Sequence, residues 1–167
     1  MTTDTPVLTV LMPVYNEVRS IRQILAKVRA VAISHEILIV DDGSEDGTRT
    51  ILEEEGQVPG ARVILHPRNQ GKGSAIRTGL GHANGRFTVV QDADLEYDPS
   101  EFEQLLEPLL AGRADVVYGS RFLGQPEAMS GLHRFGNLLL TGITNVLYGA
   151  RLTDMETCYK VIRTDLA

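Results

Sequence analysis

Short apolar runs alternate with helical patterns along the first two thirds of this chain. The runs lie at 7–12, 36–40, 62–65, 87–90 and 115–119 and are rich in Val, Ile and Leu, which is typical of buried strands. Between them, apolar residues recur at helical spacing, as at Val18, Ile21, Ile24, Leu25 and Val28. This alternation predicts one α/β domain with a mostly parallel central sheet covered by helices on both faces.

Residues 135–149, with the sequence FGNLLLTGITNVLYG, contain no charged side chain. The stretch is shorter than the roughly 18 apolar residues that a spanning helix needs. It predicts an interfacial helix or a wall for a lipid chain, with a buried core helix as the alternative. The chain stops at Ala167 directly after an apparent strand, so we expect a C-terminal truncation.

Composition narrows the function classes. The chain has 167 residues, 43% of them hydrophobic, which fits a single domain with a sizeable core. Its net charge of −6 argues against a nucleic-acid binder. The single cysteine, Cys158, excludes an intrachain disulfide framework and fits a reducing compartment. The polar N-terminus shows no signal peptide.

Three acids follow the fourth apolar run at alternate positions, Asp92, Asp94 and Glu96. In an extended segment these side chains share one face, where like charges repel unless a cation lies between them. A divalent ion with oxygen ligands, Mg²⁺ or Mn²⁺, is the natural candidate because such ions also hold substrate phosphates. The alternative is a solvated acidic turn.

Two further polar loops, 13–17 and 41–48, also follow strands. The carboxyl ends of parallel strands meet at one sheet edge, where ligands bind. Loop 13–17 has no glycine, so it lacks the G-x-G-x-x-G motif of dinucleotide-binding folds. The Gly71–Lys72 pair lacks the remaining residues of a P-loop. Carboxylates suit a metal, a base edge or ribose hydroxyls, so we infer a nucleotide whose phosphates are bridged by a cation. Tyr15 is either a surface for the base or plain core.

Five segments in order resemble the motifs of family 2 glycosyltransferases with the GT-A fold. They are PVYNE at 13–17, DDGSEDGT at 41–48, NQGKG at 69–73, DADLE at 92–96 and GSRF at 119–122. The most similar subgroup is the dolichyl- or polyprenyl-phosphate sugar synthases. The resemblance implies a Rossmann-like GT-A catalytic domain over 1–167. It also implies inverting, metal-dependent transfer of a hexose from GDP-mannose or UDP-glucose to a polyprenyl or dolichyl phosphate.

The resemblance also implies roles for single residues. The nucleotide-sugar positions are Pro13, Tyr15, Glu17, Val40, Asp42, Asp92, Ala93 and Arg121. Asp92, Asp94 and Glu96 match the metal ligands, although many of these synthases have Gln at the position of Glu96. Asp94 and Arg121 match the catalytic positions.

An acceptor phosphate is anionic near neutral pH, so it needs cations rather than a dedicated base. Arg121 and Arg134 are the candidates, with an ordinary surface charge as the alternative for Arg134. A lipid acceptor implies peripheral contact with the cytoplasmic face of a membrane.

Two alternatives remain at this point. One is a family 2 transferase whose acceptor is a soluble glycan or a protein. The other is a receiver-like signalling module, because residues 37–42 resemble the acidic-pocket strand of such domains and Asp92 is placed as a phosphoacceptor. A receiver requires a lysine after its fifth strand, whereas no lysine occurs between Lys72 and Lys160.

Overall fold

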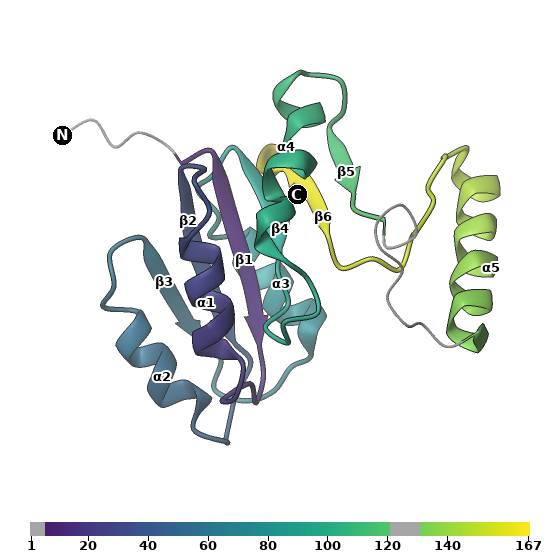
Figure 1. Cartoon of the computed structure of the whole chain (residues 1–167). Coiled ribbons are helices and arrows are strands. Elements are labelled where there is room, and N and C mark those ends of the chain that lie inside the picture. The colour runs from purple at the N-terminus through teal and green to yellow at the C-terminus, as the bar shows by residue number, and fades with distance from the viewer. Residues whose placement is uncertain (1–5, 121–130) are drawn as a thin grey trace.

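A computed structural model describes residues 6–120 and 131–167, with the side chains of 131–134 left out of the description. Its centre is a six-stranded sheet in the order β3-β2-β1-β4-β6-β5 (Figure 1). The strands are β1 (Leu8–Val14), β2 (His35–Asp41), β3 (Ala61–Leu65), β4 (Phe87–Val90), β5 (Val116–Tyr118) and β6 (Lys160–Arg163). Strand β6 is antiparallel to its neighbours β4 and β5, and the other pairs are parallel. The predicted mostly parallel sheet is confirmed.

Helices cover both faces of the sheet. They are α1 (Ile21–Arg29), α2 (Thr48–Glu55), α3 (Lys72–Leu80) and α4 (Phe102–Leu110). The structure also contains α5 (Gly131–Tyr148) and 3₁₀ turns at Pro99–Glu101 and Thr164–Leu166. Alternate residues of β1 point to opposite faces. Val10 and Met12 join the large core cluster under α1, α2 and α4, whereas Leu11 packs with Ala75 of α3 in a smaller cluster.

The sequence placed the end of β1 too early. Pro13 and Val14, which we expected in the loop, are part of the strand and pair in register with Val40 and Asp41. Val18, expected on the packing face of the first helix, is 38% exposed because α1 begins only at Ile21. The longer strand carries Pro13 to the edge where the polar loops meet.

Strand β1 lies between β2 and β4, and all three run in the same direction. The chain leaves β1 toward β2 and β3 on one side, and later returns to form β4 on the other. A ligand crevice forms at such a switch point, outside the carboxyl ends of the strands. The fold thus brings the loops after β1, β2 and β4 together.

Helix α5 turns its apolar residues outward. It stands beside the sheet instead of covering it (Figure 1). Its largest exposed side chains include Phe135 (66%), Val146 (84%), Leu147 (72%) and Tyr148 (80%), so the interpretation as a buried core helix is wrong. Among the described helices, none is both long and apolar enough to cross a membrane.

The polar residues of α5 face the protein instead. Asn137, Thr141 and Asn145 recur every fourth position and therefore share one side of the helix. Asn137 donates to Asp154 (2.8 Å), Thr141 accepts from the Met155 amide (3.1 Å), and Asn145 exchanges two hydrogen bonds with the Leu152 backbone. This polar side docks α5 onto residues 152–155 and leaves the apolar side outward.

Candidate active site

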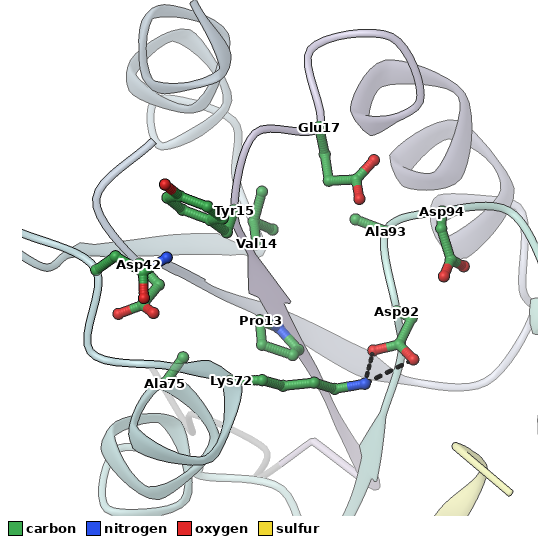
Figure 2. A pocket seen from close by; sticks show the side chains of 11 residues that line it. Pro13, Val14, Tyr15, Glu17, Asp42, Lys72, Ala75, Asp92, Ala93 and Asp94 are labelled. Atoms are coloured by element: carbon green, nitrogen blue, oxygen red, sulfur yellow. Dashed lines mark hydrogen bonds and ion pairs between the residues drawn. The ribbon is translucent and has the colours of Figure 1, made fainter. Parts of the chain in front are cut away.

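A cavity of about 290 Å³ opens at the carboxyl ends of β1, β2 and β4 (Figure 2). It is lined by Pro13, Val14, Tyr15, Glu17, Asp42, Asn69, Lys72, Ala75, Asp92, Ala93 and Asp94. The structure thus brings together most of the positions that the sequence singled out. The loops converge as expected, and the loop after β3 joins them.

The loop after β1 is fixed to the loop after β2 by backbone-to-side-chain hydrogen bonds. Asn16 has a left-handed φ of 58°, which asparagine tolerates better than most residues. Its amide donates to Ser44 Oγ and its side-chain oxygen accepts from the Glu45 amide, both at 2.9 Å. The Glu17 amide donates to Thr48 Oγ1, also at 2.9 Å. These bonds hold the loop that carries two of the cavity side chains.

Asp41 and Asp42 have different surroundings although they are adjacent. Asp41 is fully buried and accepts from Nε (2.9 Å) and Nη2 (2.6 Å) of Arg49. The same guanidinium donates to the His66 carbonyl at 2.6 Å, so it ties β2 to β3. Asp41 therefore supports the loop, and Asp42 is the acid that reaches the cavity.

Asp42 anchors the turn that follows β3. Its carboxylate accepts from the amides of Gln70 (3.0 Å) and Gly71 (2.7 Å). His66 Nδ1 lies 2.7 Å from Oδ1 of the same carboxylate. An ionised carboxylate has about four acceptor positions, so most of those on Asp42 are engaged within the protein.

Lys72, the first residue of α3, crosses the floor of the cavity to Asp92 (Figure 2). Its Nζ lies 2.6 Å from Oδ1 and 2.8 Å from Oδ2 of the carboxylate. Burial acts to lower the pKa of Lys72, but the hydrogen bond and charge of Asp92, with the charge of Asp94, outweigh it and raise that pKa above its ordinary value. The lysine is therefore a cation at this position.

The three acids after β4 are not on one extended face, so that expectation is wrong. The strand ends at Val90 and the chain bends, with Leu95 in the left-handed region at φ 68°. Asp94 Oδ1 accepts from the Glu96 amide (3.1 Å), which closes the bend. Glu96 consequently lines a neighbouring cavity of about 330 Å³, and Asp92 lines both cavities.

Val40, another predicted nucleotide-sugar position, falls outside the cavity lining. Val40 is fully buried in the smaller core cluster with Leu11, Leu38 and Ala75, directly behind the cavity wall. Arg121 lies outside the described residues, as does the side chain of Arg134.

Sequence reasoning missed Asn69 and Ala75, and it did not pair Lys72 with Asp92. A signal was available, because β3 is also parallel and its following loop must open at the same edge. The sequence indicated the NQGKG segment through the resemblance and the Gly71–Lys72 pair through its partial P-loop pattern, and neither signal points to Asp92. The contact of this segment with the acidic loop depends on how far α3 starts from β4, which local periodicity does not encode.

The donor set of the cavity fits a divalent metal ion only in combination with a ligand. Asp92 and Asp94 supply carboxylate oxygens, whereas no group of three His, Cys, Asp or Glu side chains suited to a metal occurs in the described part of the chain. Mg²⁺ and similar ions are commonly held by one or two carboxylates plus substrate phosphates. Two carboxylates beside an open cavity match that arrangement.

Comparison with known proteins identifies relatives. The sequence model of "Glycosyl transferase family 2" matches residues 9–166. The undecaprenyl-phosphate 4-deoxy-4-formamido-L-arabinose transferase of Edwardsiella ictaluri is 35% identical over 163 residues, which are 94% of this chain and 49% of that protein. The chain spans about half, or less, of the length of the curated relatives it matches.

Solved structures share the fold. Glucosyl-3-phosphoglycerate synthase from Mycobacterium tuberculosis, solved with Mn²⁺, UDP and phosphoglyceric acid, superposes with a TM-score of 0.71 at 21% identity, covering 96% of this chain and 57% of that one. The mannosyltransferase PcManGT from Pyrobaculum calidifontis, solved with GDP-Man and Mn²⁺, gives a TM-score of 0.52 at 28% identity, covering 59% and 30%. The predicted GT-A fold is confirmed.

The same findings exclude the receiver-like alternative. The family model covers nearly the whole chain. The sheet order also differs, because the flavodoxin-like order of receivers is 2-1-3-4-5, whereas here an antiparallel β6 lies between β4 and β5.

Proposed function

Because this chain belongs to glycosyltransferase family 2, we propose that residues 1–167 form a GT-A catalytic domain that transfers a hexose from a nucleotide-diphosphosugar to a polyprenyl or dolichyl phosphate. The observation that carries the proposal is the cavity at the switch point of the sheet, with Asp42 on one wall and Asp92 and Asp94 on the other. GDP-mannose and UDP-glucose are the candidate donors.

The nucleoside end of the donor lies against Pro13, Tyr15 and Asp42 in this proposal. Tyr15 is 44% exposed at the cavity mouth, so its ring is accessible for contact with a base. Asp42 is fixed by its hydrogen bonds to the turn before α3, which leaves it a rigid acceptor for a base edge or ribose hydroxyl. Glu17 borders the same cavity and stays a predicted contact.

The diphosphate lies near Asp92 and Asp94, which would hold Mg²⁺ or Mn²⁺ together with the phosphate oxygens. The metal supplies charge stabilisation of the departing nucleoside diphosphate. Binding of Mn²⁺ with GDP-Man by the 28% identical Pyrobaculum protein supports a divalent ion here. Glu96 stays a predicted ligand, although it lines the neighbouring cavity.

The acceptor phosphate attacks the anomeric carbon from the face opposite the leaving group, so the configuration inverts. The phosphate is already anionic near neutral pH, and the chain contributes chiefly orientation and charge. We assign Arg121 and Arg134 to the acceptor phosphate, and Arg121 also to the reacting centre, because an anion there needs cationic partners.

The outward apolar side of α5 supports a lipid acceptor and peripheral contact with a membrane. We propose that this contact is with the cytoplasmic face of the membrane. Residues 135–149, which include most of α5, carry no charge, and the polar side of the helix is occupied by residues 152–155. Undecaprenyl phosphate is named as the acceptor of the 35% identical Edwardsiella relative.

A transfer assay tests the proposal. The protein is incubated with labelled GDP-mannose or UDP-glucose, Mn²⁺ and a polyprenyl phosphate, and the label is then extracted into organic solvent. Label in the organic phase supports the proposal. Label transferred only to an added soluble glycan or protein favours the alternative acceptor class, and absence of transfer to any acceptor contradicts the assignment.

Asp94→Asn sharpens the same assay. The amide oxygen can still accept from the Glu96 amide, so the bend survives while the charge is lost. We expect transfer to fall about 100-fold or more. Glu53→Gln, which neutralises an exposed acid on α2, is the control and should transfer normally. Near-normal turnover of Asp94→Asn would contradict the metal assignment.

A further inference from the structure

We propose that Lys72 is an internal counter-ion that pairs with Asp92 before the donor binds and makes metal binding depend on the donor diphosphate. The inference rests on the proposed function, since it takes Asp92 as a metal ligand. Its starting point is that one ammonium contacts both oxygens of the carboxylate.

The contact occupies the same atoms that a metal would need. Nζ lies 2.6 Å from one oxygen of Asp92 and 2.8 Å from the other, so the carboxylate is already charge-compensated. Two cations that approach the same oxygens repel each other. A divalent ion can bind Asp92 only after the ammonium has moved off at least one oxygen.

The side chain of Lys72 is exposed, whereas the turn that precedes it is anchored by hydrogen bonds. The lysine side chain is 55% exposed, against 17% for the Asp92 side chain. Asp42 holds the amides of Gln70 and Gly71, the two residues directly before Lys72. The side chain therefore extends from an anchored turn into the cavity that it lines.

The donor changes the balance between the two cations. Before a diphosphate binds, a displaced Lys72 ammonium loses a charge-assisted hydrogen bond and gains only water. With a diphosphate in the cavity, the displaced ammonium gains phosphate oxygens as new partners. Metal and donor thus favour each other's binding, and the coupling is reciprocal.

The test measures Mn²⁺ binding, not transfer. Free Mn²⁺ is followed by electron paramagnetic resonance with protein alone, and then with UDP or GDP present after correction for Mn²⁺ bound to free nucleotide. We expect wild-type protein to bind Mn²⁺ alone about tenfold more weakly than with nucleotide. Lys72→Met should bind Mn²⁺ alone about tenfold more tightly than wild type, with less enhancement by nucleotide.

Lys160→Met is the matched control. Lys160 also borders the cavity that Asp92 and Glu96 share, but its ammonium donates to the Thr157 carbonyl and lies 5.3 Å from the centre of the Tyr118 ring. Its loss should change Mn²⁺ affinity by less than about threefold. Circular dichroism and melting curves establish that both variants are folded.

Three results would overturn the inference. If wild type and Lys72→Met bind Mn²⁺ with equal affinity while the wild-type protein transfers sugar to the lipid, the counter-ion role is wrong and the proposed function is intact. Equal gains in Lys72→Met and Lys160→Met would show a general charge effect instead of displacement. Absence of Mn²⁺ binding with and without nucleotide overturns both the inference and the proposed metal site.

Discussion

The imidazole of His66 lies between a cavity acid and a helix. Its Nδ1 is 2.7 Å from Oδ1 of Asp42, and its Nε2 is 3.0 Å from Oγ1 of Thr78 on α3. The ring is 7% exposed. A neutral imidazole that carries its proton on Nδ1 donates to the carboxylate and accepts from the hydroxyl, so both ring nitrogens are satisfied. His66 thus orients Asp42 without reaching the cavity itself.

His66→Phe should raise the KM for the donor about tenfold while kcat changes less, because a hydrogen bond to a charged group is lost and only the amides of the turn before α3 still hold Asp42. Steady-state kinetics with varied donor measure the split. His66→Gln keeps a donor and should recover part of the affinity. His35→Phe is the control, because His35 begins β2 and Asp42 follows the opposite end of that strand. An unchanged KM in folded His66→Phe would mean that the ring serves only packing.

Gly43→Ala should destabilise the protein strongly. Gly43 has φ +80°, and a Cβ there would lie 2.5 Å from the carbonyl carbon of Arg68. We expect the free energy of unfolding to fall by about 3 kcal/mol or more. Gly60 has a similar φ of +85° with nothing within 4 Å, so Gly60→Ala should lose only about 1 kcal/mol. Urea denaturation measures both, and equal losses would contradict the steric argument.

Glu36 should make the stability of the protein sensitive to acid. Burial acts to raise the pKa of Glu36, but hydrogen bonds from Thr9 (2.7 Å), Asn84 and Arg62 outweigh it and place the pKa below its ordinary value. A lowered pKa in the folded state stabilises the protein above the unfolded pKa near 4.5. That contribution is lost as the pH falls through the lower folded value.

Urea denaturation at pH 6 and at pH 3.5 tests this linkage. The free energy of unfolding of wild type should drop more between the two values than that of Glu36→Gln, which has no charge to lose. At pH 6 the variant should be less stable by about 1 kcal/mol. Glu53→Gln, on an exposed position, should follow wild type. Parallel pH profiles for wild type and Glu36→Gln would contradict the assignment.

The sequence predicted the fold because its signals are local. Apolar runs and helical periodicity each specify nearby backbone, as does Asp98, which accepts from the Ser100 amide at 3.1 Å at the start of the turn Pro99–Glu101. The position of strand β6 in the sheet could not be predicted, because its insertion between β4 and β5 depends on contacts between residues more than 40 positions apart, such as Val116 with Ile162. Periodicity carries no information on such pairing.

For the candidate site, the sequence predicted which loops converge but not the directions of their side chains. Which loops converge followed from strand direction, so Tyr15, Asp42 and Asp92 were placed together correctly. How their side chains point did not follow. The bend closed by Asp94 turns Glu96 into a neighbouring cavity, which it shares with Asp92, and the start of α3 at Lys72 sets the contact with Asp92. Both depend on exact backbone direction over a few residues.

The outward side of α5 leads to the last prediction, which concerns lipid binding. Val146 and Leu147 are 84% and 72% exposed, and inserting a leucine-sized side chain into an apolar phase gains about 1.5–3 kcal/mol. The double variant Val146→Asp/Leu147→Asp should therefore reduce binding to vesicles of phosphatidylglycerol and phosphatidylethanolamine about tenfold or more in a flotation assay, because each aspartate also repels the anionic surface.

Leu110→Asp, at a 52% exposed leucine of α4, makes a comparable substitution away from α5 and should leave vesicle binding nearly unchanged. Equal vesicle binding by the α5 variant and wild type would contradict a role of this helix at a membrane. A polar docking side formed by Asn137, Thr141 and Asn145 implies that the variant keeps its fold, which its melting temperature would verify.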